Sequence, residues 1–298
     1  MENVRGAALM VAAMAGFAFE DMFVKSAARS LPVGEILMIF GFAGMCVFIA
    51  LTLRSGRPVL HPAILSRPIA IRAANEVVGR LGYTLGIALT PLSNASAILQ
   101  ATPLVVVAGA AVFFGEKVGW RRWLAIAIGF AGVLVILRPA TDGFVPASLW
   151  VVLGLLGFAA RDLATRAAPP VLSNLQLGVY GFFMLIPTGA LILSVTGGAA
   201  WPGGRAALDL LGAVVFGTAA YYGVTAAMRM GDVSVVTPFR YTRLLFALVL
   251  AAIVFGERPD LPMWIGAGLI VASGLYTLLS GRRRPGRGAA PDPGVFPQ

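Results

Sequence analysis

Apolar residues fall in blocks of about twenty along most of the chain, separated by short polar or Gly/Pro breaks. A helix rises 1.5 Å per residue, so about 20 apolar residues span the hydrocarbon layer of a membrane. Lipid offers the backbone no hydrogen-bond partner, so each block is expected to be helical. The pattern predicts ten membrane-spanning helices, at roughly residues 4–26, 33–54, 68–90, 92–114, 121–138, 147–168, 172–196, 206–229, 233–255 and 261–281.

Gly and Pro mark most of the breaks between these blocks. The third and fourth predicted helices meet almost directly at Thr90-Pro91, which predicts a tight antiparallel pair. The segment 282–298 is rich in Arg, Gly and Pro, which predicts a disordered tail.

The charge distribution fits a membrane protein rather than a nucleic-acid-binding one. The chain is 58% hydrophobic and 12% charged, with a net charge of +10, whereas soluble domains carry about 25% charge. The basic residues sit mostly in short loops and at the C-terminus, which predicts a bacterial-type inner-membrane protein with both termini in the cytoplasm. With one Cys and one His, Cys46 and His61, no internal disulfide, metal site or cofactor is expected.

The sequence repeats itself at a shift of 141 residues. This shift carries Asp21 onto Asp162, Gly82 onto Gly223 and Trp123 onto Trp264, without a gap. The repeat predicts two five-helix units, 1–141 and 142–281. Because five is odd, the second unit enters the membrane from the opposite side. Such an inverted repeat suits alternating access around a central site.

The repeated segments Phe114-Gly115-Glu116 and Phe255-Gly256-Glu257 are each followed by a helix that bears a Trp. Together with ten helices in two halves, they resemble the EamA-domain branch of the drug/metabolite transporter superfamily, over about residues 5–281. The stretch from Asp232 to Glu257 is similar to bacterial S-adenosylmethionine uptake carriers, and related carriers take up riboflavin. Other members of the branch export amino acids or drugs, so the resemblance leaves the direction of transport open.

Ionisable residues inside membrane helices are costly and usually face a bundle interior or a cavity. Arg72, Glu76 and Arg80 follow at intervals of four in the third predicted helix, with Tyr83 close to the same face. Glu76 is either a substrate contact or proton carrier in a central cavity, or a member of a structural ion pair. The predicted helices hold four acidic and four basic residues well inside them, namely Glu20, Asp21, Glu76, Arg80, Arg161, Asp162, Arg240 and Arg243.

Arg240 and Arg243 lie at i, i+3 spacing behind Pro238 in the ninth predicted helix. Guanidinium groups bind carboxylates and phosphates through two nitrogens and keep their charge. We interpret Arg240 foremost as an anion-recognising group. The alternative is that one arginine pairs with Glu76 or Asp162 while the other reaches the membrane interface.

Two repeat-related pairs of charges are candidates for gating. Glu20 and Asp21 in the first helix correspond to Arg161 and Asp162 in the sixth. We expect them to hold one state of the transport cycle closed. The alternative is that they are solvated charges near the membrane interface.

Polar and aromatic side chains complete the candidate site. Aromatic faces with a few hydrogen-bonding groups suit a planar ring ligand, although the same residue types also serve helix packing. The residues expected to bind substrate or to couple its transport are Glu76, Arg80, Tyr83, Gln100, Tyr222, Arg240, Tyr241 and Arg243.

These features predict a secondary active transporter for a small polar metabolite, such as riboflavin or S-adenosylmethionine. The sequence lacks the Gly-rich phosphate-binding motif with a Lys that ATP-hydrolysing proteins carry, so ATP hydrolysis by this chain is not expected. Transport must then be driven by a gradient, for example of protons, or by exchange. An enzyme is not expected, because His61 lies in a loop and no Gly-x-Ser-x-Gly motif occurs. Export of amino acids or drugs, and a scaffold or sensor without transport, remain alternatives. The oligomeric state stays open, with a homodimer among the options.

Overall fold

The computed structural model describes residues 2–115, 118–139, 141, 144–167, 169, 171–230 and 236–280, and all regular elements in these ranges are helical. Their bounds agree with the predicted helices to within a few residues. The elements are α1 (Glu2–Ala27), α2 (Val33–Arg54), η1 (Pro62–Leu65), α3 (Arg67–Leu89), α4 (Leu92–Leu99), α5 (Thr102–Phe113), α6 (Trp120–Leu137), α7 (Ser148–Arg166), α8 (Asn174–Thr196), α9 (Gly204–Met230), η2 (Thr237–Tyr241), α11 (Thr242–Phe255) and α12 (Leu261–Ser280). The predicted tail, 282–298, lies outside the described residues.

Nine segments among the described residues are long and apolar enough to cross a membrane. The remaining predicted span corresponds to α3, which has 23 residues and is therefore long enough. Its sequence carries Arg72, Glu76 and Arg80, which reduce its apolar character. Most of these three side chains' surface is buried by other helices.

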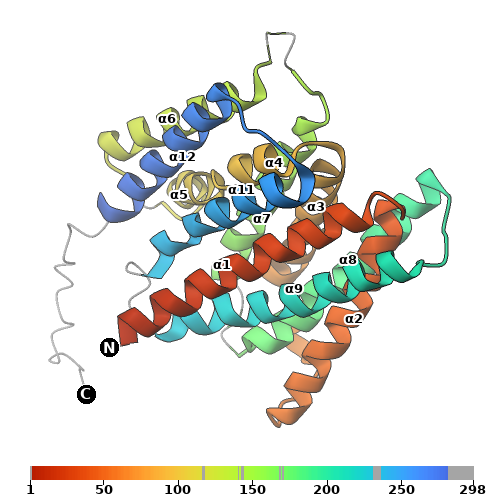
Figure 1. The fold of residues 1–298 in the computed structure, drawn as a ribbon. Helices are drawn as coiled ribbons and strands as arrows, with labels where there is room; N and C mark the ends of the chain where they lie inside the picture. The colour runs from red at the N-terminus through yellow and green to blue at the C-terminus, as the bar shows by residue number, and fades with distance from the viewer. Residues whose placement is uncertain are drawn as a thin grey trace, which may run out of the picture.

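The helices pair mainly across the two halves of the chain. The most extensive contacts are those of α1 with α9, α3 with α7, α2 with α8, and α6 with α12. Figure 1 shows α1 and α9 side by side at the front, and α6 beside α12 at the top. The prediction of a tight pair between the third and fourth helices is wrong, because α3 packs far more extensively against α7 than against α4.

Glycines on both helices explain why α3 packs closely against α7. A Cβ atom at Gly82 would lie 2.5 Å from the backbone nitrogen of Gly154, and one at Gly157 would lie 2.4 Å from that of Gly79. The two backbones therefore touch at positions where any side chain would collide. Small residues permit such close packing in lipid, where no hydrophobic force drives helices together. This contact brings the charged face of α3 against α7.

The fourth and ninth predicted spans are both interrupted, and at corresponding positions. Gln100 and Ala101 separate α4 from α5, and the ninth span changes from η2 to α11 between Tyr241 and Thr242. The repeat shift of 141 carries Ala101 onto Thr242. The two interrupted spans contact each other through α4 and α11. Interrupted helices at corresponding places in two repeats are typical of transporter binding sites.

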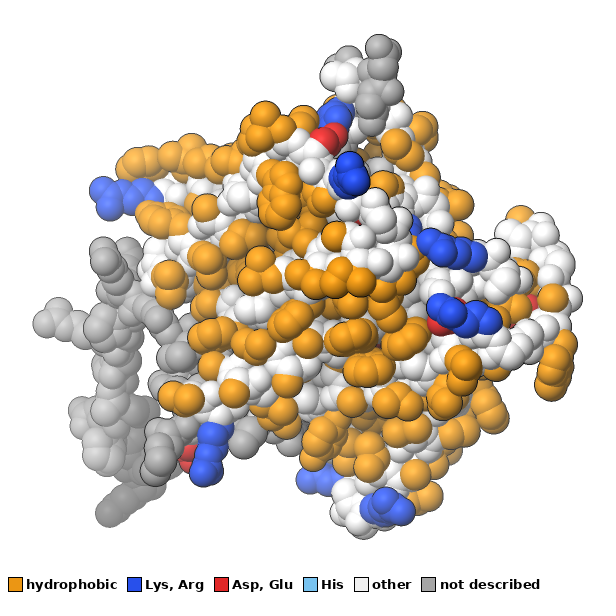
Figure 2. Space-filling view, viewed as in Figure 1, with side chains coloured by type: hydrophobic (Ala, Val, Ile, Leu, Met, Phe, Trp, Pro, Cys, Tyr) orange, Lys and Arg blue, Asp and Glu red, His pale blue; other side chains and the backbone are white. Residues whose placement is uncertain are grey.

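Large apolar side chains are exposed on most of the helices. Figure 2 shows hydrophobic side chains across the visible face, with Lys and Arg mainly towards its margins. Exposed large apolar side chains include Val112, Val195 and Ile253. Such a surface fits contact with lipid acyl chains rather than with water.

Candidate functional site

A network of charged and polar side chains from five helices lies in the interior. It joins acidic and basic groups that the sequence places far apart, and the ion pairs Glu76–Arg161 and Asp21–Arg243 link the two halves of the chain. Its members are Glu20 and Asp21 on α1, Arg72, Glu76, Arg80 and Tyr83 on α3, Arg161, Asp162 and Thr165 on α7, Tyr221 on α9 and Arg243 on α11.

Glu76 lies at the centre of this network. Its side chain is almost completely buried, and three arginines surround its carboxylate. The nearest nitrogens are 3.8 Å away for Arg72, 3.6 Å for Arg80 and 3.4 Å for Arg161. A buried charge is tolerated only when it is paired, so these arginines allow Glu76 to stay ionised. The spacing of the third helix predicted the first two partners but not Arg161.

The neighbouring acids of α1 bind different arginines. Glu20 Oε1 accepts a hydrogen bond of 2.9 Å from Arg80 Nη1. Asp21 accepts hydrogen bonds from Arg243 through Nη2 at 2.7 Å and Nε at 3.2 Å, and from the Tyr83 hydroxyl at 3.0 Å. Asp21 therefore ties α1 to both α11 and α3.

The four predicted gating residues do not form direct pairs between α1 and α7. Arg161 donates to Asp162 at 2.7 Å, on its own helix, and lies near Glu76. Glu20 is connected to Arg161 only through Arg80 and Glu76. The reason is the packing order, since α1 lies mainly against α9 while α3 packs against α7.

Tyr221 belongs to the network, although Tyr222 was the predicted residue. Arg72 Nη2 donates to the Tyr221 hydroxyl at 3.4 Å, and Arg72 Nε donates to Thr165 Oγ1 at 3.1 Å. Tyr222 is 53% exposed and lies on the outer surface. The repeat contains a signal that points to the right residue, because the shift of 141 carries Arg80 onto Tyr221.

Gln100, Arg240 and Tyr241 meet where the two spans are interrupted. Gln100 Nε2 donates to the backbone oxygen of Arg240 at 3.3 Å. The Tyr241 hydroxyl is buried beside Gly274 and has no hydrogen-bond partner among the described residues. The partly buried side chain of Arg240 forms no ion pair with the described residues.

One end of the bundle is joined by Lys25 and Glu257. Lys25 Nζ donates to the carbonyl oxygens of Ile87 at 3.1 Å and Thr90 at 2.5 Å, and lies 3.8 Å from Glu257 Oε1. Glu257 accepts hydrogen bonds at the start of α4. Glu116, its counterpart in the first repeat, lies outside the described residues.

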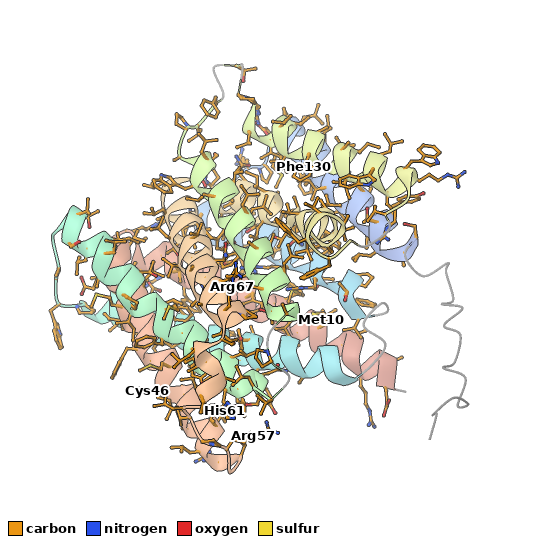
Figure 3. The ribbon with its side chains drawn as sticks, turned by 180° about the vertical axis from the view of Figure 1, so that it is seen from behind. Met10, Cys46, Arg57, His61, Arg67 and Phe130 are labelled. Atoms are coloured by element: carbon orange, nitrogen blue, oxygen red, sulfur yellow. The ribbon has the colours of Figure 1, made fainter. Side chains whose placement is uncertain are left out.

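The connection between α2 and α3 contains Arg57 and His61. Figure 3 places Arg57 and His61 at the lower end of the molecule, beyond Cys46 on α2. His61 Nδ1 accepts a hydrogen bond from the backbone N–H of Ala63 at 3.1 Å, so it caps η1. His61 therefore has a local structural role in this loop.

Nine apolar spans around a buried charge network define the class of protein as a multi-pass membrane protein with a polar interior. The sequence model of the EamA-like transporter family matches the chain twice, over residues 4–138 and 145–279. The chain therefore belongs to the EamA-like transporter family.

Relatives of named function are similar over most of the chain. A riboflavin transporter of Rhizobium johnstonii is 30% identical over 213 residues, covering 72% of this chain and 70% of the relative. An S-adenosylmethionine uptake transporter of Rickettsia felis is 28% identical over 240 residues, covering 79% and 77%. A crystal structure with 20% identity matches at a TM-score of 0.59, over 90% of this chain and 98% of the other, and supports the fold alone.

Proposed function

We propose that this protein is a secondary active transporter that takes up a small, polar, ring-bearing metabolite across a bacterial inner membrane by alternating access. The observation that carries the proposal is the Glu76 carboxylate, which is 3% exposed and lies among arginines from both halves of the chain. A buried network of this kind is costly in a membrane and is typical of a substrate or ion pathway. The named relatives make riboflavin and S-adenosylmethionine the first substrates to test.

In this proposal α3 is the tenth span, and the units 1–141 and 142–281 form an inverted repeat. The helix pairs support it, because exchanging the two halves converts the α1–α9 pair into the α7–α3 pair. The same exchange leaves the α2–α8 and α6–α12 pairs unchanged, because the two helices of each pair simply replace each other. Such symmetry allows two equivalent conformations that open to opposite sides. The excess of basic residues in alternate loops supports both termini in the cytoplasm.

The substrate site in this proposal lies between the central network and the interrupted spans. Arg240 offers a cation that the described acidic residues leave unpaired, and guanidinium nitrogens bind a carboxylate or a pair of ring carbonyl oxygens. Glu76, Arg80 and Tyr83 form the opposite wall, and Gln100 and Tyr241 supply amide and hydroxyl groups at the interruption. Arg243 holds α1 in place through Asp21.

The test is uptake into liposomes that contain the purified protein. Labelled riboflavin, S-adenosylmethionine and an aromatic amino acid are offered with and without a pH gradient. Wild type, Arg240→Ala and Glu76→Gln are compared with Tyr222→Phe as a matched control at the outer surface. We expect saturable uptake of one compound, which the first two substitutions abolish and the control retains. Efflux without uptake would favour an exporter, and absence of transport in both directions would favour a scaffold or sensor.

A further inference from the structure

Arg80 lies between two carboxylates and satisfies only one of them. Its Nη1 atom donates to Glu20 at 2.9 Å. Its Nε atom is buried, lies 3.6 Å from Glu76 Oε1, and has no hydrogen-bond partner among the described residues. A small rotation of the guanidinium towards Glu76 would satisfy Nε at the expense of the bond to Glu20. The Arg80 guanidinium can therefore take two arrangements, one bonded to Glu20 and one bonded to Glu76.

Glu20 is the least supported of the four carboxylates in the network. Glu76 has three arginines around it, and Asp162 accepts from two nitrogens of Arg161. Asp21 accepts from two nitrogens of Arg243 and from Tyr83. Within the part of the chain that the structure describes, Glu20 has one hydrogen bond, from Arg80.

Uncharged groups lie beside part of the Glu20 carboxyl group. Its carboxyl carbon and the ring of Phe40 of α2 both lie beside Gly217 of α9. The charged groups that face it are Arg80 from α3, Arg243 from α11 and its own neighbour Asp21. A buried carboxylate beside a second carboxylate is held in the charged state only by its cationic partners. Of the four acids, Glu20 is therefore the one that binds a proton at the smallest cost in broken contacts.

The Glu20–Arg80 contact is one of several polar links between two helix pairs. The others include hydrogen bonds from Tyr83 to Asp21, from Lys25 to Ile87 and from Arg72 to Tyr221. α1 packs on α9 and α3 packs on α7, whereas α1 and α3 contact each other far less extensively. The repeat-related positions are Arg161 and Tyr221, so the second half has no acid at the equivalent place. The titratable link is thus confined to one side of the pseudosymmetric bundle.

We infer that Glu20 is the residue that couples transport to protons, an inference that rests on the proposed transport function. Glu20 binds one proton and becomes neutral, and Arg80, which stays charged, leaves it and turns fully onto Glu76. The contact between the α1–α9 pair and the α3–α7 pair is then weakened, and the two pairs move relative to each other. Release of the proton from Glu20 returns Arg80 and restores the contact.

The first test measures this movement without any substrate. The exposed Cys46 is replaced by Ala, and spin labels are attached at Val4→Cys on α1 and Leu65→Cys just before α3, positions that are 74% and 87% exposed. Distances between the labels are measured by pulsed electron paramagnetic resonance between about pH 5 and about pH 9. We expect two populations whose ratio follows pH in the wild-type background.

Three substitutions make this test specific. Glu20→Gln is expected to stay in the low-pH population at every pH, and Glu20→Asp is expected to titrate still. The control is Asp209→Asn, which removes another buried acid that joins α1 to α9 through Ser26 at 2.7 Å, and it should titrate like wild type. The inference is overturned if the wild-type distances do not depend on pH, if Glu20→Gln titrates normally, or if Asp209→Asn abolishes the response.

A second test uses transport of labelled riboflavin in liposomes. With the membrane potential held at zero by valinomycin and equal potassium on both sides, a gradient of one pH unit drives roughly tenfold accumulation when one proton moves with each neutral substrate. Glu20→Gln should lose this accumulation while it still exchanges internal for external riboflavin. Loss of both activities with normal folding, or retention of both, would overturn the assignment. If wild type does not carry riboflavin, the distance measurements still decide the role of Glu20, so the two proposals fail separately.

Discussion

The carboxylate of Glu257 accepts hydrogen bonds from both the backbone N–H and the hydroxyl of Ser93, at 3.0 and 2.7 Å. It also accepts one from the backbone N–H of Leu92 at 2.8 Å. An acid from the end of α11 in the second half thus caps the start of α4 in the first half. The unpaired N–H groups of a helix start favour a negative charge. The Gly-Glu segment therefore joins the two repeats at one end of the bundle.

Removing this cap should destabilise the protein more than removing one of its donors. We expect Glu257→Ala to lower the free energy of unfolding by about 2–3 kcal/mol, because it leaves the donors of Leu92 and Ser93 without their acceptor and Lys25 without its ion-pair partner. Ser93→Ala removes one hydrogen bond and should cost about 1 kcal/mol. The two variants are compared by thermal unfolding in detergent. Equal losses for both would contradict the capping role of Glu257.

The contact between α3 and α7 should not tolerate a single methyl group. Gly82→Ala places a Cβ atom 2.5 Å from the backbone nitrogen of Gly154, and we expect a loss of about 1–3 kcal/mol from the forced separation. The matched control is Gly268→Ala on α12, where no atom lies within 4 Å of the added Cβ. The control should unfold at or above the wild-type temperature, because Ala favours helices. A tolerated Gly82→Ala would show that the two backbones separate easily.

The helices were predictable from the sequence, but their partners were not. The predicted span 33–54 has the same bounds as α2, because lipid fixes both the length and the apolar character of a span. The hydrophobic pattern contains no information on which spans meet. The α3–α7 pair became visible in the structure, where Gly82 lies against Gly154. Within the sequence, the internal repeat was the one feature that related distant positions to each other, through the shift of 141 residues.

The site was predictable where its residues share one helix. The spacing of Glu76 and Arg80 places them on one face, and the structure has them paired. The contacts of Arg161 with Glu76 and of Arg243 with Asp21 depend on helix packing, which local spacing does not encode. Tyr221 was missed in favour of its neighbour, since consecutive residues point about 100° apart on a helix.

The two neighbouring tyrosines of α9 should differ in their effect on transport. Tyr221→Phe removes the hydroxyl that accepts from Arg72, and we expect uptake to fall by about fivefold, because the charged guanidinium of Arg72 loses a buried acceptor. Tyr222→Phe changes a side chain on the outer surface and should leave uptake within about twofold of wild type. Initial rates of uptake in liposomes measure both. The reverse order of effects would place Tyr222 in the polar interior.

Asp260 should stabilise the fold in a manner that depends on pH. It accepts hydrogen bonds from Arg138, which directly follows α6, and from the backbone N–H of Met263 at 3.1 Å, so it joins the end of α6 to the start of α12. The hydrogen bond from Arg138 is the main reason why the pKa of Asp260 lies below its usual value. Because the folded pKa is lowered, the contribution is present above the unfolded pKa of about 3.9 and is lost as the pH falls through the folded value.

The measurement compares wild type with Asp260→Asn, which keeps the cap of α12 but removes the charge. Since the side chain of Asp260 is 49% exposed, the difference in stability at neutral pH should stay below about 1 kcal/mol. It should shrink towards zero in thermal unfolding below about pH 4. A difference that grows on acidification would have the wrong sign for a lowered pKa.

Variants of the ion pair between Arg243 and Asp21 distinguish a structural role of Arg243 from a role in binding the substrate. Its Nε and Nη2 atoms both bind the carboxylate of Asp21, and a lysine offers no such pair of nitrogens in a fixed plane. Arg243→Lys and Asp21→Asn should each reduce the amount of folded protein in the membrane, because each leaves a buried charge poorly paired. The double variant Asp21→Asn with Arg243→Gln removes both charges and should restore the folded amount, because the two effects are coupled. If uptake returns with it, Arg243 holds α1 against α11; if the folded double variant remains inactive, Arg243 also contacts the substrate.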